Sequence, residues 1–412
     1  MKAARTLFPI EERVAWRNWV TPKLLRQKPI HSWYTFPHSF TSELVHGLIS
    51  EWGLSKNDFI LDPFAGAGTT ILTAKEGGIP ATGYDLSPLA VLVTKVKIAK
   101  YDLGKLRRAW AELSLSAQSR EWSGAEKSYP KLVEKALPGR LLGAFESLAN
   151  AVRSLSCSET EKDFFRLALL ATVPRYSRAV VTGGWLKWID RRTNVRSLGS
   201  AFRNRVHAML ADLEKDKLSR ETHWHMHEAD ARRLPDSASK YSAVITSPPY
   251  PNRHDYTRVF GVELMLEFLD WEETRQLRYQ SFHSHPEARP VRPASRDYEC
   301  PKALAKTLAR LREKGLERKI LGMLAGYFLD MHLCLAEINR VCRKGASVGL
   351  VLGNAQYCGE ELAVDEMTAE IGESAGLVCR NIIAVRYRGN SAQQMGAYGR
   401  NPSRESIVVF TT

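Results

Sequence analysis

The residues whose types and spacing are best suited to bind a ligand form the string Asp62-Pro63-Phe64-Ala65-Gly66-Ala67-Gly68-Thr69-Thr70. The glycines allow a sharp turn and leave room for a ligand beside the backbone, and the helix predicted to follow offers free N–H groups at its N-terminus. Asp85 ends the next apolar run, where a carboxylate can accept both hydroxyls of a ribose. The string is not a dinucleotide fingerprint, because position 71 is Ile, and it is not a P-loop, because no Gly-Lys-Ser/Thr follows.

A second candidate string, Thr246-Ser247-Pro248-Pro249-Tyr250, directly follows the apolar run 241–245. The Oγ atom of Ser247 and the carbonyl oxygen of Pro248 are hydrogen-bond acceptors. Two successive prolines fix φ and remove competing N–H donors, so both acceptors are expected to be preorganised. The ring of Tyr250 offers a flat face for stacking. This string therefore predicts a site that accepts protons from a planar group.

Both strings depend on a sheet to position them. The pattern predicts a helix over 41–53, a strand over 59–61, a helix over 69–77 and a strand over 81–85. This strand–turn–helix–strand unit opens a parallel α/β sheet. Further strands are expected at 223–228, 241–246 and 346–352, and a buried helix at 320–342. The fold class is therefore α/β, with a Rossmann-like, mostly parallel sheet that ends in an antiparallel hairpin of strands 377–388 and 405–411.

The sequence also predicts how the chain is divided. Residues 1–30 are basic and are expected to form an N-terminal arm, while 31–103 and 221–412 form the domain that holds both strings. Residues 104–220 have a mostly helical pattern and are long enough for an inserted subdomain. From Arg275 to Lys319 there are 12 Lys/Arg against 5 Asp/Glu, so 272–319 is expected to be a basic loop followed by a helix over 301–319.

Composition limits the partners and the compartment. The 412 residues carry a formal net charge of +14, with a pI of about 9.5, which favours a polyanionic partner, most often nucleic acid. No cysteine lies in a CxxC pair, and the alternating His223, His225 and His227 match no ligand spacing, so no metal site is expected. The chain has neither an N-terminal apolar signal region nor a long apolar span, so we expect a cytoplasmic protein without a membrane segment.

The glycine-rich string closely resembles the cofactor-binding motif of the class I DNA amino-methyltransferases, which use S-adenosylmethionine. The resemblance implies that the glycine turn lies beneath the methionine part, that Asp85 holds the ribose and that Asp230 lies near the adenine. The segment 33–40 is similar to a further motif of that family, which packs around the methionine end. The cofactor-binding residues implied are Phe36, Pro37, Asp62, Pro63, Phe64, Ala65, Gly66, Gly68, Thr69, Thr70, Asp85, Leu86, Asp230 and Ala231.

The Ser-Pro-Pro-Tyr string is similar to the catalytic motif of the same family, which implies that Ser247, Pro248, Pro249 and Tyr250 are catalytic. An exocyclic amino nitrogen is a poor nucleophile, because its lone pair is delocalised into the ring. Acceptors for its protons make the nitrogen more tetrahedral, and Tyr250 would stack on a base taken out of the helix. Serine at the first position is typical of cytosine-N4 enzymes. The order of the two motifs is the reverse of that in many such enzymes. Cytosine-C5 chemistry is not expected, because no Pro-Cys pair occurs.

The expected substrate is double-stranded DNA. Arg253, His254, Tyr256 and Arg258 follow the catalytic string and are expected to line the pocket entrance, and Arg388 begins a loop, 388–401, that is expected to contact the flipped base. Two basic segments, 175–196 and 275–319, are candidates for holding phosphates. Three alternatives remain open: an adenine-N6 DNA enzyme, an RNA amino-methyltransferase, and a non-catalytic nucleic-acid-binding module. A restriction or defence-system partner also remains open.

Overall fold

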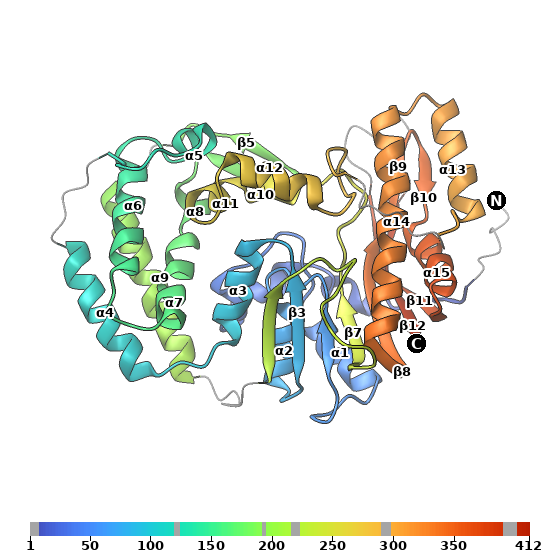
Figure 1. The fold of residues 1–412 in the computed structure, drawn as a ribbon, viewed down its shortest axis with the longest axis horizontal. Coiled ribbons are helices and arrows are strands. Elements are labelled where there is room, and N and C mark those ends of the chain that lie inside the picture. Colours follow the sequence, from blue (N-terminus) through green and yellow to red (C-terminus); the bar gives the residue numbers. More distant parts are fainter. Residues whose placement is uncertain (1–7, 119–123, 192–194, 216–222, 290–297, 390–401) are drawn as a thin grey trace.

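The computed structural model describes residues 8–118, 124–191, 195–215, 223–289, 298–389 and 402–412. An eight-stranded sheet runs through the molecule in the order β1-β11-β12-β8-β7-β2-β3-β6 (Figure 1). Its strands are β1 (Ile10–Glu12), β2 (Ile60–Asp62), β3 (Ala81–Asp85), β6 (Trp224–Glu228), β7 (Tyr241–Thr246), β8 (Cys342–Gly353), β11 (Val378–Arg388) and β12 (Ser403–Thr411).

The direction of the strands confirms the predicted fold class. Strands β6, β3, β2, β7 and β8 pair in parallel, whereas β12 is antiparallel to both β8 and β11. The result is a Rossmann-like sheet with an antiparallel C-terminal pair. Because the carboxyl ends of parallel strands lie at one edge of a sheet, the turn after β2, Asp85 at the end of β3 and Ser247 after β7 come to the same edge.

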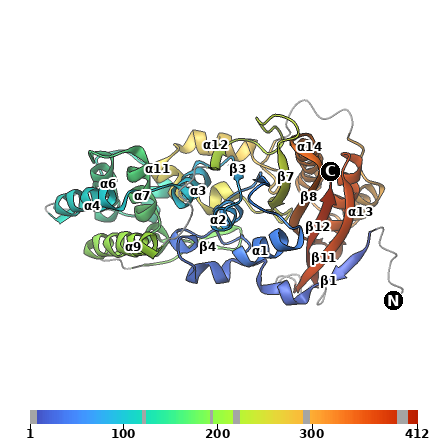
Figure 2. The same ribbon diagram turned by 90° about the horizontal axis from the view of Figure 1, so that it is seen from below.

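Helices cover both faces of the sheet (Figures 1 and 2). Helices α1 (Ser42–Glu51), α2 (Thr69–Glu76) and α3 (Pro88–Ile98) cover one face, and α14 (Arg318–Val341) and α15 (Val364–Ser374) cover the other. Successive strand residues alternate between the two cores: Ile60 packs with the α2–α3 side and Leu61 with the α14 side. Buried parallel strands are apolar on both faces for this reason.

Helix α14 is long and apolar enough to cross a membrane by length and composition alone. In this structure 61% of its apolar window is buried inside the protein, and the helix packs against the central sheet (Figure 1). The predicted buried helix over 320–342 is thereby confirmed as part of the core.

The inserted segment packs on α3 and continues its hydrophobic core. It contributes α4 (Leu103–Gln118), α5 (Lys131–Ala136), α6 (Arg140–Arg153), α7 (Glu159–Leu170), α8 (Val173–Tyr176) and α9 (Val195–Lys215). It also contains a β-hairpin that the helical pattern did not predict, formed by β4 (Ala179–Thr182) and β5 (Trp185–Trp188). The turn between these strands is Gly183-Gly184, and Gly183 has a φ of +59°, which glycine adopts without strain.

Two further segments differ from the sequence interpretation. The N-terminal segment, expected as an arm, adds β1 to the sheet beside β11 and continues through the 3-10 turns Val14–Asn18, Pro22–Gln27 and His31–Trp33. The residues from 272 onward were expected to form a loop, and this was wrong for 272–280, which are helical. A capping box of Asp270 and Glu273 starts α12 (Trp271–Gln280). Helices α10 (Tyr256–Val259), α11 (Gly261–Glu267) and α13 (Lys302–Glu313) and the pair β9 (Ala355–Tyr357) and β10 (Glu360–Leu362) complete the fold.

Candidate active site

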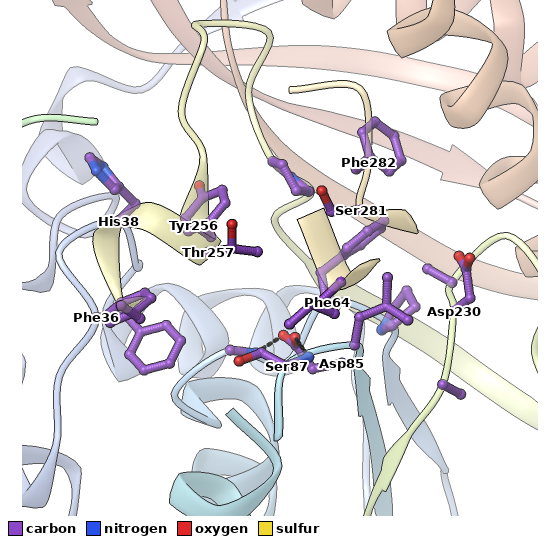
Figure 3. Close-up of a pocket in the computed structure, with 18 of the residues that line it drawn as sticks. Phe36, His38, Phe64, Asp85, Ser87, Asp230, Tyr256, Thr257, Ser281 and Phe282 are labelled. Atoms are coloured by element: carbon purple, nitrogen blue, oxygen red, sulfur yellow. Dashed lines mark hydrogen bonds between the residues drawn. The ribbon is translucent and has the colours of Figure 1, made fainter. Parts of the chain in front are cut away.

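A cavity opens at the carboxyl edge of the parallel strands (Figure 3). We call it the first cavity. Figure 3 shows Asp85 and Ser87 at its floor, Phe36, His38 and Tyr256 on one side, and Asp230, Ser281 and Phe282 on the other. Its lining residues are Phe36, His38, Pro63, Phe64, Gly66, Asp85, Leu86, Ser87, Ala229, Asp230, Ala231, Arg232, Ser247, Pro249, Tyr256, Thr257, Phe260, Leu264, Leu277, Ser281 and Phe282. The cavity therefore joins residues of both candidate strings.

The glycine turn needs glycine at two positions for different reasons. Gly66 has a φ of +51° and lines the first cavity, so its missing side chain leaves the backbone open to a ligand. Gly68 has a φ of +77° and precedes α2, and a Cβ atom there would lie 2.6 Å from Oγ1 of Thr94. Thr94 in turn donates a hydrogen bond from Oγ1 to the carbonyl oxygen of Gly66 at 3.1 Å. Through Thr94, helix α3 therefore holds the glycine turn in this conformation.

A buried amine supports the same turn. Lys97 Nζ donates hydrogen bonds to the carbonyl oxygens of Tyr34, at 2.7 Å, and Ala67, at 2.8 Å. Burial lowers the pKa of Lys97 to about 7. The amine links the segment before α1 to the glycine turn.

Asp85 presents a carboxylate to the floor of the first cavity. Its Oδ2 accepts a hydrogen bond from the backbone N–H of Gly66, and its Oδ1 accepts one from that of Ser87, both at 2.9 Å. Burial raises the pKa of Asp85. Each oxygen keeps a further acceptor site, so the donor set fits a ligand with two neighbouring hydroxyls, such as a ribose. A glycine backbone beside this carboxylate fits the cofactor S-adenosylmethionine.

Several residues expected to bind the cofactor shape the turn and do not line the first cavity. Asp62 is 1% exposed, and its Oδ1 accepts hydrogen bonds from Oγ1 of Thr246 at 2.6 Å and from the N–H of Phe64 at 3.1 Å. Burial raises the pKa of Asp62 to about 6. Thr70 Oγ1 donates to the carbonyl oxygen of Ile245 at 3.0 Å. Ala65, Gly68 and Thr69 do not line the first cavity either, and Pro37 lines an adjoining cavity instead.

A second cavity adjoins the first. It is lined by Val20, Thr21, Pro22, Pro37, His38, Ser39, Phe40, Ser247, Pro248, Tyr250, Asn252, His254, Tyr256, Val351, Arg386, Arg388 and Glu405. Ser247, His38 and Tyr256 line both cavities. Ser247 donates a hydrogen bond from Oγ to the carbonyl oxygen of Val351 at 3.1 Å. Its single proton is thereby used, and its lone pairs remain to accept a hydrogen bond from a ligand.

The ring of Tyr250 in the second cavity is held by two contacts, one at its hydroxyl and one over its ring. Its hydroxyl donates to Oε1 of Glu405 at 3.1 Å, and the guanidinium of Arg388 lies 5.7 Å from the ring centre. Glu405 is 3% exposed and accepts from Nε of Arg386 at 2.8 Å. A Cβ atom on Gly353 would lie 2.8 Å from the Tyr250 ring and 2.6 Å from Nη2 of Arg388. Glycine at 353 is therefore needed to keep this wall in place.

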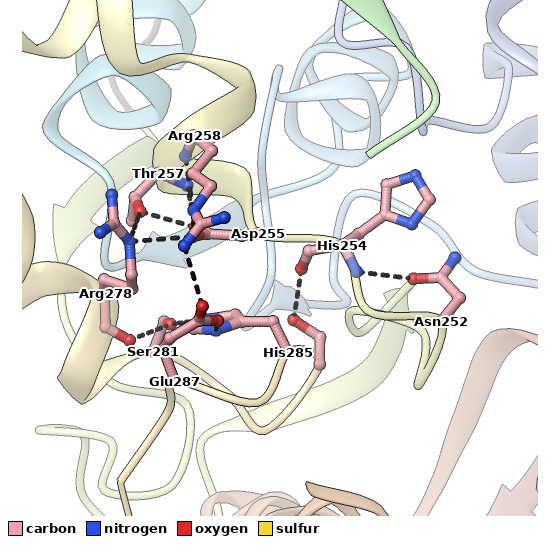
Figure 4. A network of polar contacts seen from close by, with 10 residues as sticks. Asn252, His254, Asp255, Thr257, Arg258, Arg278, Ser281, His285 and Glu287 are labelled. Carbon is pink, nitrogen blue, oxygen red and sulfur yellow. Dashed lines mark hydrogen bonds and ion pairs between the residues drawn. The ribbon is translucent and has the colours of Figure 1, made fainter. Parts of the chain in front are cut away.

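The segment after Tyr250 is fixed by a charged network (Figure 4). Asp255 caps α10 and pairs with Nε of Arg258 at 3.1 Å and Nε of Arg278 at 2.8 Å. Arg258 also pairs with Glu287 at 2.8 Å. Asp255, His285 and Glu287 lie close enough together to hold a cation, but the two arginines already neutralise the two carboxylates. Arg258 therefore positions this segment, although the sequence predicted it at the pocket entrance.

Figure 4 also shows His254 pointing away from that network. Its two ring nitrogens are buried without a hydrogen-bond partner among the described residues. Burial lowers the pKa of His254 to about 4, so the ring is neutral at pH 7. Arg253, in contrast, is exposed with a φ of +66° and lines neither cavity.

The opposite wall of the first cavity contains Asp230 and Ala231, which the sequence predicted, and Phe282 and Arg232, which it did not. Phe282 lies edge-on to Phe64 with 5.7 Å between ring centres. Arg232 pairs with Asp230 at 2.7 Å and with the buried Asp330 of α14 at 3.0 Å. The acid expected near the adenine is thus held by a buried arginine. No local pattern identified Phe282 or Arg232, whereas His38 lies inside the aromatic segment 33–40 that was already identified.

Comparison with known proteins agrees with this geometry. A family model described as a DNA methylase matches residues 12–95, which include the glycine turn and Asp85. Over these residues the chain is similar to DNA methylases. The matched residues include Gly66 and Asp85 at the floor of the first cavity, whose arrangement fits S-adenosylmethionine.

The chain is similar along nearly its whole length to two bacterial proteins. It is 29% identical to Type II methyltransferase M.BsoBI of Geobacillus stearothermophilus, over 96% of this chain and 88% of the relative. It is 27% identical to Type II methyltransferase M.AvaI of Nostoc sp., over 96% of this chain and 89% of the relative. A solved structure, the TehB-like methyltransferase of Corynebacterium glutamicum, is 9% identical with a TM-score of 0.30, over 89% of this chain and 87% of that one. The sequence matches support an amino-methyltransferase.

Proposed function

We propose that this chain is a site-specific DNA methyltransferase that transfers a methyl group to the N4 amino group of a flipped-out cytosine. One observation carries the proposal: Ser247 lines both the cavity that contains Gly66 and Asp85 and the cavity that contains Tyr250. A methyl donor in the first cavity and a planar base in the second would meet at Ser247.

The proposed chemistry uses groups that the structure already orients. S-adenosylmethionine supplies an electrophilic methyl group on a sulfonium sulfur. Ser247 Oγ, its own proton committed to Val351, accepts a hydrogen bond from one amino proton of the base, and the carbonyl oxygen of Pro248 accepts the other. When bound, the cofactor would give its methyl group to the amino nitrogen, with the C–S electron pair passing to sulfur and one amino proton passing to solvent. Tyr250, anchored by Glu405, stacks on the base.

Cytosine is favoured over adenine by the serine that opens the Ser-Pro-Pro-Tyr string. The adenine-N6 alternative is supported by the order of the two strings, because the cofactor string comes first. Both alternatives use the same two cavities and differ only in the base that the second one accepts.

Double-stranded DNA as the substrate is supported by three observations. The chain has a formal net charge of +14, the matching family model is described as a DNA methylase, and both long relatives are named Type II methyltransferases. We further propose that the inserted segment 104–220 and the basic stretch 272–319 contact the DNA outside the catalytic sheet. Residues 390–401, expected to contact the base, and 290–297 lie outside the described part of the chain.

Incubation with methyl-labelled cofactor tests this proposal. Duplex DNA, single-stranded DNA and RNA are supplied separately, and the nucleosides are then identified by mass spectrometry. Label in N4-methylcytosine from duplex DNA supports the proposal, whereas N6-methyladenine supports the alternative. Label only in RNA, or binding to DNA without transfer, would contradict both.

A further inference from the structure

The β4–β5 hairpin presents an exposed aromatic face. In its register Thr182 pairs with Trp185 and Val180 with Lys187, and paired residues lie on the same face of a hairpin. Trp185 and Lys187 therefore share one face, while Leu186 and Trp188 share the other. Trp185 is 59% exposed and Lys187 is also exposed. Tryptophan is enriched at interfaces, where it offers a large apolar ring and a polar N–H.

The hairpin is seated directly against the second cavity. The Cβ position of Gly184 lies 3.1 Å from the His254 ring, and His38 makes a hydrogen bond to the backbone of Gly183. Both histidines line the second cavity. The turn of the hairpin thus forms part of the surroundings of the proposed base pocket, although it belongs to the inserted segment.

Trp185 is exposed yet held in place. The guanidinium of Arg258 lies 5.7 Å from the centre of its ring, and Arg258 is itself fixed by Asp255 and Glu287. The segment that follows the catalytic string therefore supports the tryptophan from below. Its ring is exposed to solvent and directly follows Gly184, which adjoins His254 of the second cavity.

The charges near the hairpin fit a polyanion. Arg175 and Lys187 are exposed, and the guanidinium of Arg191 contacts the backbone of Pro174 and Arg175. The nearby acids are Asp190, which is exposed, and Asp255 and Glu287, which are paired with Arg258. An exposed aromatic ring flanked by cations is the combination that stacks on bases and holds phosphates.

We propose that the β4–β5 hairpin enters the DNA next to the target base, and that Trp185 stacks in the space that the everted base leaves. This inference rests on the proposed function, since it needs a base to be moved into the second cavity. Eversion leaves an unstacked gap in the duplex, and side chains inserted between base steps stabilise such distorted DNA. Trp185 is large, flat and already held beside the pocket.

The test measures methyl transfer to two DNA duplexes by the wild type and by the variants Trp185→Ala, Trp185→Phe and Trp188→Ala. The methylated site is first mapped on plasmid DNA, and a short duplex with that site is prepared with the target base either paired or mismatched. We expect Trp185→Ala to lower kcat/KM for methyl transfer to the paired duplex about tenfold to a hundredfold, the usual effect of losing one stacking contact. On the mismatched duplex, where eversion costs less, the loss should nearly vanish.

The other variants separate stacking from a structural role. Trp185→Phe keeps a flat ring and should restore most of the transfer, and Trp188→Ala, on the opposite face, should behave as wild type on both duplexes. The dependence of DNA binding on salt should not change in Trp185→Ala, because no phosphate contact is lost. Equal losses on both duplexes, or no loss on the paired one, would overturn the assignment of Trp185. Absence of transfer by the wild type would instead refute the proposed function and this inference with it.

Discussion

Thr246 donates a hydrogen bond of 2.6 Å from Oγ1 to Oδ1 of Asp62. Both side chains are buried, and each belongs to one of the two strings on which the site depends. Asp62 opens the glycine turn, and Thr246 directly precedes Ser247. The bond therefore links the start of the glycine turn to the residue before Ser247 and helps to fix the distance between the two strings.

Ser247→Ala should remove methyl transfer while leaving the cofactor bound. The variant loses the Oγ acceptor at the point shared by both cavities, and loss of one preorganised polar contact to a transition state typically costs about a hundredfold to a thousandfold in kcat. Transfer is measured with labelled cofactor, and cofactor affinity is measured by calorimetry. Transfer at the wild-type rate would refute the role given to Ser247.

Asp85→Asn and Asp62→Asn should differ in cofactor affinity, although both acids belong to the predicted cofactor site. Asp85 lines the first cavity, and Asp62 does not. We expect the Asp85 variant to bind S-adenosylmethionine about ten times more weakly or worse, since hydrogen bonds to a charged group contribute about 1.5–3 kcal/mol. Asp62→Asn keeps an acceptor for Thr246 and should bind nearly as wild type. Equal weakening in both variants would contradict this division of roles.

The stability of the protein should depend on pH through Asp62. Its pKa is about 6 in the folded chain, raised by burial from an ordinary 3.8, so the folded state binds more protons between these values. The contribution of Asp62 to stability is therefore greatest below pH 3.8 and is lost as the pH rises through 6. Relative to Asp62→Asn, the wild type should lose about 1–1.5 kcal/mol of unfolding free energy between pH 5 and pH 7.5. Urea denaturation at both pH values measures the difference, and an unchanged difference would show that Asp62 titrates normally.

Gly353→Ala should impair transfer without affecting cofactor binding. The added Cβ atom would meet Tyr250 and Arg388 in the second cavity, so the ring that we propose stacks on the base must move. A matched control is Gly322→Ala on α14, where a Cβ atom meets nothing within 4 Å and alanine favours the helix. We expect a lower kcat/KM for DNA only in the Gly353 variant. A wild-type value there would mean that the position of Tyr250 is not critical.

The sequence predicted the central sheet well because its strands are buried on both faces. Continuous apolar runs such as 241–246 occur where helices cover both sides of a parallel sheet. The edge at which Gly66 and Ser247 meet then follows from the strand direction. This is why two strings far apart in the chain could be expected to share one site before the structure was known.

Other parts of the site could not be derived from the local pattern. Phe282 and Arg232 reach the first cavity through tertiary packing against α14, and sequence spacing carries no record of that contact. Asp62 lies in the cofactor string, but its side chain is buried because it accepts a hydrogen bond from Thr246, far away in the sequence. The hairpin and α12 could have been found: Gly183-Gly184 between alternating residues indicates a turn, and Asp270 with Glu273 forms a capping box.

Methylome sequencing of a bacterial host that expresses the protein tests the central claim most directly. The host DNA is compared with that of the same host expressing Ser247→Ala. We predict N4-methylcytosine at one short recurring sequence with the wild type and none with the variant. Methylated adenine at the recurring sequence, or the same cytosine signal from Ser247→Ala, would contradict the account.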